Sequence, residues 1–129
     1  MRSTFLIAAA AVAALMSGEA RAADPAHGQA IFKVTCALCH VAQKGASPSE
    51  LAVFKGPNLW GVVGRKAGTF RPYSYSYAMR SSGITWTDDQ LRRYITSPQT
   101  AVPNVRMSFL GLKNPRDRED MIAFLNTMH

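Results

Sequence analysis

The chain of 129 residues carries 15 lysines and arginines against 8 aspartates and glutamates, which gives a formal net charge of +7. Apart from Arg2 and Arg21, the basic residues are scattered from Lys33 to Arg118. They form no dense run of the kind that binds nucleic acid, so the charge argues against a nucleic-acid target and favours an acidic protein partner.

Residues 1–22 have the features of a secretory signal peptide. Arg2 is followed by a largely apolar run over residues 4–16, and a small-residue cleavage site of the A-x-A type ends at Ala22. The apolar run falls short of the roughly 20 residues that span a bilayer, which argues against a retained anchor. We therefore expect cleavage after Ala22, export to the periplasm, and a single mature domain over residues 23–129.

The first predicted element of that domain is a helix over residues 24–35. Ile31 and Val34 lie at helical spacing within it, and Asp24 followed by Pro25 is typical of a helix start. This helix leads directly into the motif that carries the chemistry.

Residues 36–40 form a CxxCH pentapeptide that contains both cysteines of the chain. The thiols of Cys36 and Cys39 can each add to one of the two vinyl groups of a haem, and the imidazole of His40 is then held as a ligand to the iron. The motif therefore predicts one covalently attached haem c.

Three other interpretations of the two cysteines compete with haem attachment. A disulfide of the thioredoxin type needs a βαβ setting, and the preceding strand is missing from the pattern. A zinc site needs further ligands, but His27 and His129 lie near the two ends of the mature chain. Two merely structural thiols would leave His40 unexplained.

After the motif, residues 41–57 lose clear periodicity and are rich in glycine, proline and serine. We predict a loop with one short helical turn over residues 50–54, and the irregular character continues to Gly68. No strand is predicted.

Two further helices are predicted in the second half of the chain. Thr87 and Gln90 match a capping box, and that helix should end before Pro98. Asn114 as the N-cap and Pro115 at the first helical position begin the last helix. The apolar faces of the two helices contain Leu91, Tyr94, Ile95, Met121, Ile122, Phe124 and Leu125. The expected fold is all-α, with three main helices and long loops around one haem that supplies packing surface.

The second axial ligand has four candidates among the methionines of the mature chain. Met121 lies on the apolar face of the last helix, where methionine usually fills the core, and Met128 lies at a terminus that is expected to fray. Met107 follows a loop over residues 103–106 that can direct its side chain toward the iron. Met107 is therefore preferred, with Met79 as its rival.

The whole mature chain resembles the class I cytochromes c, particularly the mitochondrial-like and bacterial c-two-type branch. The resemblance rests on an ordered series of segments around the CxxCH motif: residues 28–32 (GQAIF), 56–61 (GPNLWG), 64–68 (GRKAG), 73–75 (YSY), 83–86 (GITW), 91–95 (LRRYI), 107–111 (MSFLG) and 118–125 (REDMIAFL). It implies the small cytochrome c fold.

The resemblance also implies roles around the iron. Cys36 and Cys39 would carry the thioethers, and His40 and Met107 would be the axial ligands. Pro57 would offer its carbonyl to the other ring nitrogen of His40, which fixes the tautomer of the imidazole.

Further roles are implied for four residues that would contact the haem. Arg65, Tyr75 and Trp86 match positions that hold a buried propionate, which would be costly to bury without partners. Tyr94 matches the residue whose hydroxyl approaches the sulfur of the methionine ligand. Each of the three aromatic residues could instead be an ordinary core side chain.

The resemblance implies a packing role where the first and last helices cross. Gly28 would permit close approach, and Phe32 would pack against Phe124. Phe32, Phe124 and Leu125 are expected in the core whatever the function.

The implied function is single-electron transfer by a monomer that docks transiently, from a cytochrome bc-type complex to a terminal oxidase or photosynthetic reaction centre. Lys55, Arg106 and Lys113 are the residues expected to steer an acidic partner. The main alternative is a five-coordinate haem enzyme or gas sensor that binds peroxide, nitric oxide or carbon monoxide, and another is an accessory haem subunit of a larger complex. The first predicts that Met107 is not a ligand, and the second predicts a large exposed apolar patch.

Overall fold

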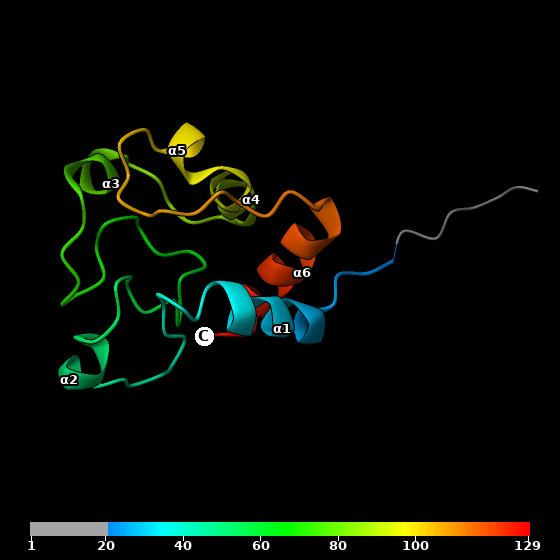
Figure 1. The fold of residues 1–129 in the computed structure, drawn as a ribbon, viewed down its shortest axis with the longest axis horizontal. Helices are drawn as coiled ribbons and strands as arrows, with labels where there is room; N and C mark the ends of the chain where they lie inside the picture. The colour runs from blue at the N-terminus through cyan, green and yellow to red at the C-terminus, as the bar shows by residue number, and fades with distance from the viewer. Residues whose placement is uncertain (1–20) are drawn as a thin grey trace, which may run out of the picture.

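The computed structural model describes residues 21–129 (Figure 1). The predicted signal peptide lies outside the described residues, except for its last two positions. The described chain contains six helices: α1 (Pro25–Thr35), α2 (Pro48–Leu51), α3 (Tyr77–Ser81), α4 (Asp88–Thr96), α5 (Pro98–Ala101) and α6 (Pro115–Asn126). Within residues 21–129 the only β pairing is an isolated bridge between Lys66 and Thr85, and no helix combines the length and apolar character needed to cross a bilayer.

The long helices α1 and α6 pack against each other, and Figure 1 shows them crossing at one side of the molecule. Gly28 makes the close approach possible, because a Cβ at this position would lie 2.0 Å from the carbonyl oxygen of Asp120. The rings of Phe32 and Phe124 meet with their centroids 5.4 Å apart. The predicted crossing of the first and last helices is therefore confirmed.

The three main helices begin at the residues whose side chains can satisfy free backbone amides. The carboxylate of Asp24 accepts hydrogen bonds from the amides of residues 26 and 27, and Pro25 follows at the first helical position. The Thr87 hydroxyl accepts from the amide of Gln90, and the Asn114 side chain accepts from the amide of residue 116. These caps explain why the predicted starts agree with the structure.

Helix α4 is tied to α6 by a charged pair as well as by its apolar face. The Arg92 guanidinium donates to both carboxylate oxygens of Glu119, at 2.6 and 2.9 Å, and also to Asp89 one turn earlier. These contacts lower the pKa of Glu119, the hydrogen bonds from Arg92 being the largest cause. The pair orients α4 on α6 at the edge of the core.

Four details differ from the sequence-based prediction. Gln90 does not return a hydrogen bond to complete a capping box, whereas Ser47 and Glu50 form a complete one. The short turn predicted over residues 50–54 is α2, which begins two residues earlier. Helices α3 and α5 were not predicted, because four or five residues carry too little periodicity to be recognised.

The C-terminus also differs from expectation, because it is packed rather than frayed. Met128 is only 4 % exposed, and its carbonyl accepts a hydrogen bond from the amide of Gly61 at 2.9 Å. A turn far away in the sequence therefore holds the end of the chain. Met128 belongs to the core together with Met121, which is 1 % exposed.

The contact between α1 and α6 includes a buried carboxylate, from which a pH dependence follows. Asp120 is 5 % exposed, and it accepts hydrogen bonds from the amide of Asp24 at 2.6 Å and from the His27 ring at 2.7 Å. These two bonds, the backbone one first, lower the pKa of Asp120. The folded state therefore stabilises the carboxylate, and this contribution is present above the ordinary pKa of an aspartate and lost as the pH falls through the lowered value.

We expect Asp120→Asn to weaken the protein at neutral pH and to flatten its loss of stability in acid. The reason is that the asparagine amide has no proton to gain between about pH 5 and pH 2. Urea unfolding of the holoprotein over this range measures the difference. Asp117→Asn, on the same helix, is the matched control and should keep the wild-type pH dependence; the same acid sensitivity in Asp120→Asn would contradict the assignment.

Candidate functional site

His40 is held in one tautomer by the loop that follows it. Its Nδ1 atom lies 2.8 Å from the carbonyl oxygen of Pro57. Because a carbonyl can only accept, Nδ1 carries the proton and Nε2 keeps its lone pair. His40 is 8 % exposed, and burial lowers its pKa although the bond to Pro57 opposes this shift. A buried neutral imidazole with a free nitrogen is the form that ligates a metal.

Gly56 allows the Pro57 segment to approach the His40 ring closely. A Cβ at position 56 would lie 2.4 Å from Cε1 of His40 and 2.6 Å from Nδ1. The Gly56 amide also donates to the carbonyl of Cys39 at 2.8 Å. Only glycine fits here, although sequence reasoning assigned Gly56 no role.

The CxxCH motif lies at the end of α1, and in the described chain Cys36 and Cys39 are not joined by a disulfide. Burial raises the pKa of the Cys36 thiol to about 11, with the neighbouring Cys39 adding to the shift. A redox-active CxxC pair has a lowered thiol pKa, so the thioredoxin-type interpretation does not fit. Within residues 21–129 no group of three His, Cys, Asp or Glu side chains could hold a metal ion, which also disfavours the zinc site.

Arg65 and Trp86 are brought together by backbone pairing of two separate segments. The Trp86 amide donates to the carbonyl of Arg65 at 2.9 Å, and the Gly64 amide donates to the carbonyl of Trp86 at 2.8 Å. The Trp86 and Tyr94 rings are in contact, with centroids 4.9 Å apart. The positions that the resemblance assigned to propionate and methionine contacts are thus neighbours in space.

The Arg65 guanidinium is only partly exposed, and it has no carboxylate partner among the described residues. It donates to the carbonyls of Asn58 at 3.0 Å and Trp60 at 3.3 Å, and no ion pair within residues 21–129 includes it. Burial lowers its pKa, while the nearby Tyr75 opposes that shift. A half-buried cation of this kind calls for an anion that the described part of the chain does not supply.

Burial also acts on the two tyrosines of this region. It raises the pKa of Tyr75, although the charge on Arg65 counteracts part of the shift. It raises the pKa of Tyr94 as well, and Tyr94 is 8 % exposed. Both hydroxyls therefore stay protonated at neutral pH and can donate hydrogen bonds.

Met107 lies on the loop between α5 and α6, and its side chain packs against the core cluster that contains Trp86 and Tyr94. The Gln99 side chain donates to the carbonyl of Val105 at 2.9 Å and to that of Met107 at 3.3 Å. The rival Met79 is 6 % exposed and belongs to the core itself.

Sequence reasoning missed one buried polar residue that holds the long loop in place. Asn58 is 4 % exposed. Its side-chain NH2 group donates to the carbonyl of Gln43 at 2.7 Å, and its side-chain oxygen accepts from the backbone amides of Gln43 and Trp60. Asn58 directly follows Pro57, so it fixes the segment that contacts His40. The GPN sequence contains this signal, because a buried asparagine beside a glycine and a proline is typical of a structured turn.

These residues fit a haem. The two thiols match the two vinyl groups, and a neutral imidazole and a thioether are available as axial ligands. The guanidinium of Arg65 donates to two uncharged carbonyls, which do not compensate its positive charge. A haem propionate carries the negative charge that would do so. The donor set and the unmet charge therefore point to the same group.

Comparison with known proteins agrees with this chemistry. The cytochrome c family model matches residues 25–129. A cytochrome c2 from Rhodomicrobium vannielii is 44 % identical over 95 % of this chain and 94 % of its own, and a cytochrome c2 from Rhodopila globiformis is 42 % identical over 86 % and 99 %. The solved structure of cytochrome cH from Methylobacterium extorquens is similar, with a TM-score of 0.70, 36 % identity, and coverage of 81 % of this chain and 98 % of its own. The chain therefore belongs to the cytochrome c family: it is a c-type cytochrome, an electron carrier with one haem c bound covalently through Cys36 and Cys39.

Proposed function

We propose that His40 and Met107 are the axial ligands and that the protein carries single electrons between membrane complexes in the periplasm. The observation that carries the proposal is the 2.8 Å contact between His40 Nδ1 and the Pro57 carbonyl. It leaves Nε2 unprotonated in a buried ring, which is what a permanent iron ligand requires.

When bound, the haem supplies an iron that gains and loses one electron; the chain supplies its setting. His40 and the Met107 sulfur would close the coordination, so that little would rearrange on electron transfer. Arg65, Tyr75 and Trp86 would hold a propionate, and Arg65 would compensate its charge. The Tyr94 hydroxyl, which burial keeps protonated, would be the donor toward the sulfur of Met107.

The loop that carries Met107 is anchored on both sides, which supports its role as a ligand. The side chain of Gln99 binds two of its carbonyls, those of Val105 and Met107. On the other side Gly111 has a φ of +94°, and a Cβ there would lie 2.0 Å from the carbonyl of Thr96. A loop fixed in this way holds the Met107 backbone in one place.

The proposed donor is a cytochrome bc-type complex, and the proposed acceptor is a terminal oxidase or a photosynthetic reaction centre. Lys55, Arg106 and Lys113 are exposed, in agreement with a role in steering an acidic partner. The net charge is +7 for the full chain and +6 without residues 1–22, which supports the same electrostatics, and we propose a monomer that docks transiently. The signal peptide is proposed to be cleaved after Ala22.

The visible spectrum of the holoprotein with and without carbon monoxide tests the ligand assignment. We expect the reduced wild type to be low-spin and not to bind carbon monoxide, because the Met107 thioether occupies the sixth position. Met107→Ala should bind it readily, and Met79→Leu, a substitution of similar volume, should behave like the wild type.

Two outcomes would overturn the proposal. If Met79→Leu binds carbon monoxide and Met107→Ala does not, the methionine ligand is misassigned. If the wild type binds carbon monoxide readily, the iron has an open position, and an enzymatic or gas-sensing function replaces electron transfer.

A further inference from the structure

Three hydrogen bonds hold the backbone of residues 55–57 in place. The Pro57 carbonyl accepts from His40, the Gly56 amide donates to the Cys39 carbonyl, and the Lys55 carbonyl accepts from the hydroxyl of Tyr73 at 2.9 Å. The first two bonds connect this segment to the CxxCH motif. The third connects it to Tyr73, eighteen residues further along the chain. Of the three bonds, this is the one whose donor is a side-chain hydroxyl, which a substitution can remove.

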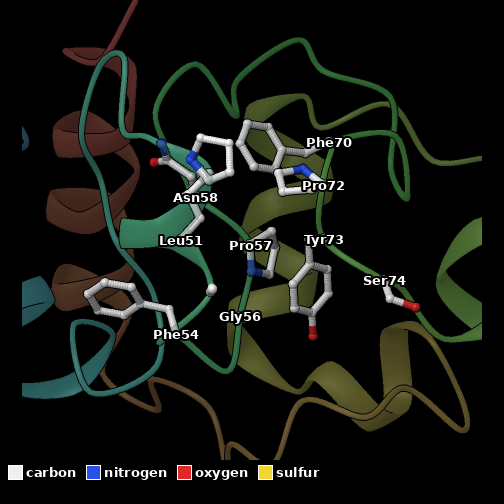
Figure 2. A pocket seen from close by; sticks show the side chains of 11 residues that line it. Leu51, Phe54, Gly56, Pro57, Asn58, Phe70, Pro72, Tyr73 and Ser74 are labelled. Atoms are coloured by element: carbon white, nitrogen blue, oxygen red, sulfur yellow. The ribbon is translucent and has the colours of Figure 1, made fainter.

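The Pro57 segment has little packing on one side, so this anchor matters. A cavity of about 320 Å³ lies there, and its lining includes Leu51, Phe54, Pro57, Phe70 and Tyr73. Figure 2 shows Tyr73 and Pro57 on different segments at this cavity, with Gly56 beside Pro57. The segment has room to shift into this cavity if the bond from Tyr73 is lost.

The ring of Tyr73 also packs against a neighbouring aromatic ring. Its ring makes an edge-to-face contact with Tyr75, with centroids 4.8 Å apart. Tyr75 in turn lies close enough to Arg65 for the guanidinium charge to lower its pKa against the effect of burial. Contacts therefore run from Tyr75 through Tyr73 to the segment that binds His40, and the charge of Arg65 acts on Tyr75.

We propose that Tyr73 is a positioning residue for the proximal ligand: by holding the Lys55 carbonyl, it keeps the Pro57 carbonyl on Nδ1 of His40. The proposal rests on the proposed role of His40 as an iron ligand. A hydrogen bond from Nδ1 to a carbonyl makes the imidazole a stronger donor, which favours oxidised iron and lowers the reduction potential. Tyr73 thus acts on the potential through Pro57, without contacting the ligand.

Tyr73→Phe in the holoprotein tests this proposal. The variant removes one hydroxyl and keeps the ring contact with Tyr75, so we expect it to fold. Its reduction potential should rise, and the Nδ1 proton of His40 should exchange with solvent faster than in the wild type, as followed by NMR of the reduced protein. Tyr77→Phe is the matched control, because the Tyr77 side chain is 77 % exposed, and it should leave both quantities unchanged.

A purely structural role for Tyr73 predicts a different pattern. It would lower the stability against urea while leaving the potential and the Nδ1 exchange as in Tyr77→Phe, and this result would overturn the proposal. The exchange of the His40 proton does not depend on which methionine binds the iron. A wild type that binds carbon monoxide therefore refutes the proposed function, whereas unchanged Nδ1 exchange in Tyr73→Phe refutes only the role of Tyr73.

Discussion

Gly28→Ala is expected to destabilise the holoprotein by about 3 kcal/mol or more, the upper end of the range for overpacked cores. The added Cβ would lie 2.0 Å from the carbonyl oxygen of Asp120 and 2.9 Å from the Cβ of Phe124. The nearest atoms belong to the backbone of α6, so no rotamer change relieves the contact and the two helices must separate. Urea unfolding at neutral pH measures the loss.

Packing and helix propensity predict opposite changes in stability for Gly28→Ala. Alanine is a better helix former than glycine by about 1 kcal/mol, so local propensity alone predicts a gain in stability. Gln29→Ala, at an exposed position next to it on α1, is the control and should change the stability by only a few tenths of a kcal/mol. A Gly28→Ala protein as stable as the wild type would show that α1 and α6 do not cross where the structure places them.

The double variant Cys36→Ala, Cys39→Ala is expected to lose all covalently bound haem and with it the stable fold. These are the two cysteines of the chain, so no other thiol can form a thioether. Without the haem the partly buried guanidinium of Arg65 also lacks an anion. Haem staining after denaturing electrophoresis and the helical circular dichroism signal measure the two losses.

Leu38→Ala is the matched control for this double variant. Leu38 lies between the two cysteines and is 77 % exposed, so it should keep both the stain and the helical signal. Haem that stays with the double variant through denaturation would mean that the attachment uses another side chain, contrary to the motif.

The main helices could be predicted because their signals are local. Asp24, Thr87 and Asn114 each cap the helix that follows, and an amide two or three residues away is enough to define the start. Helices α3 and α5 could not be predicted, since such short helices depend on their surroundings more than on their own sequence. The burial of Met128 depends on the amide of Gly61, a contact that no local pattern contains.

In the functional site, too, the local features could be predicted and the long-range contacts could not. The CxxCH motif predicts the haem and one ligand from five consecutive residues, because covalent chemistry fixes their spacing. The bond from His40 to Pro57 spans 17 positions, and only the resemblance to a family indicated it in advance. The roles of Gly56 and Tyr73 arise from close approach and from a single backbone carbonyl, so they become visible only in three dimensions.

The buried thiol of Cys36 has a consequence for how the protein is made. With a pKa of about 11, only about one Cys36 in ten thousand is a thiolate at neutral pH, and the thiolate is the form that attacks a vinyl group. In an extended chain the same thiol returns to its ordinary acidity, and its thiolate fraction rises by about two orders of magnitude. We therefore expect the Cys36 thioether to form more readily on the extended polypeptide than on the folded chain.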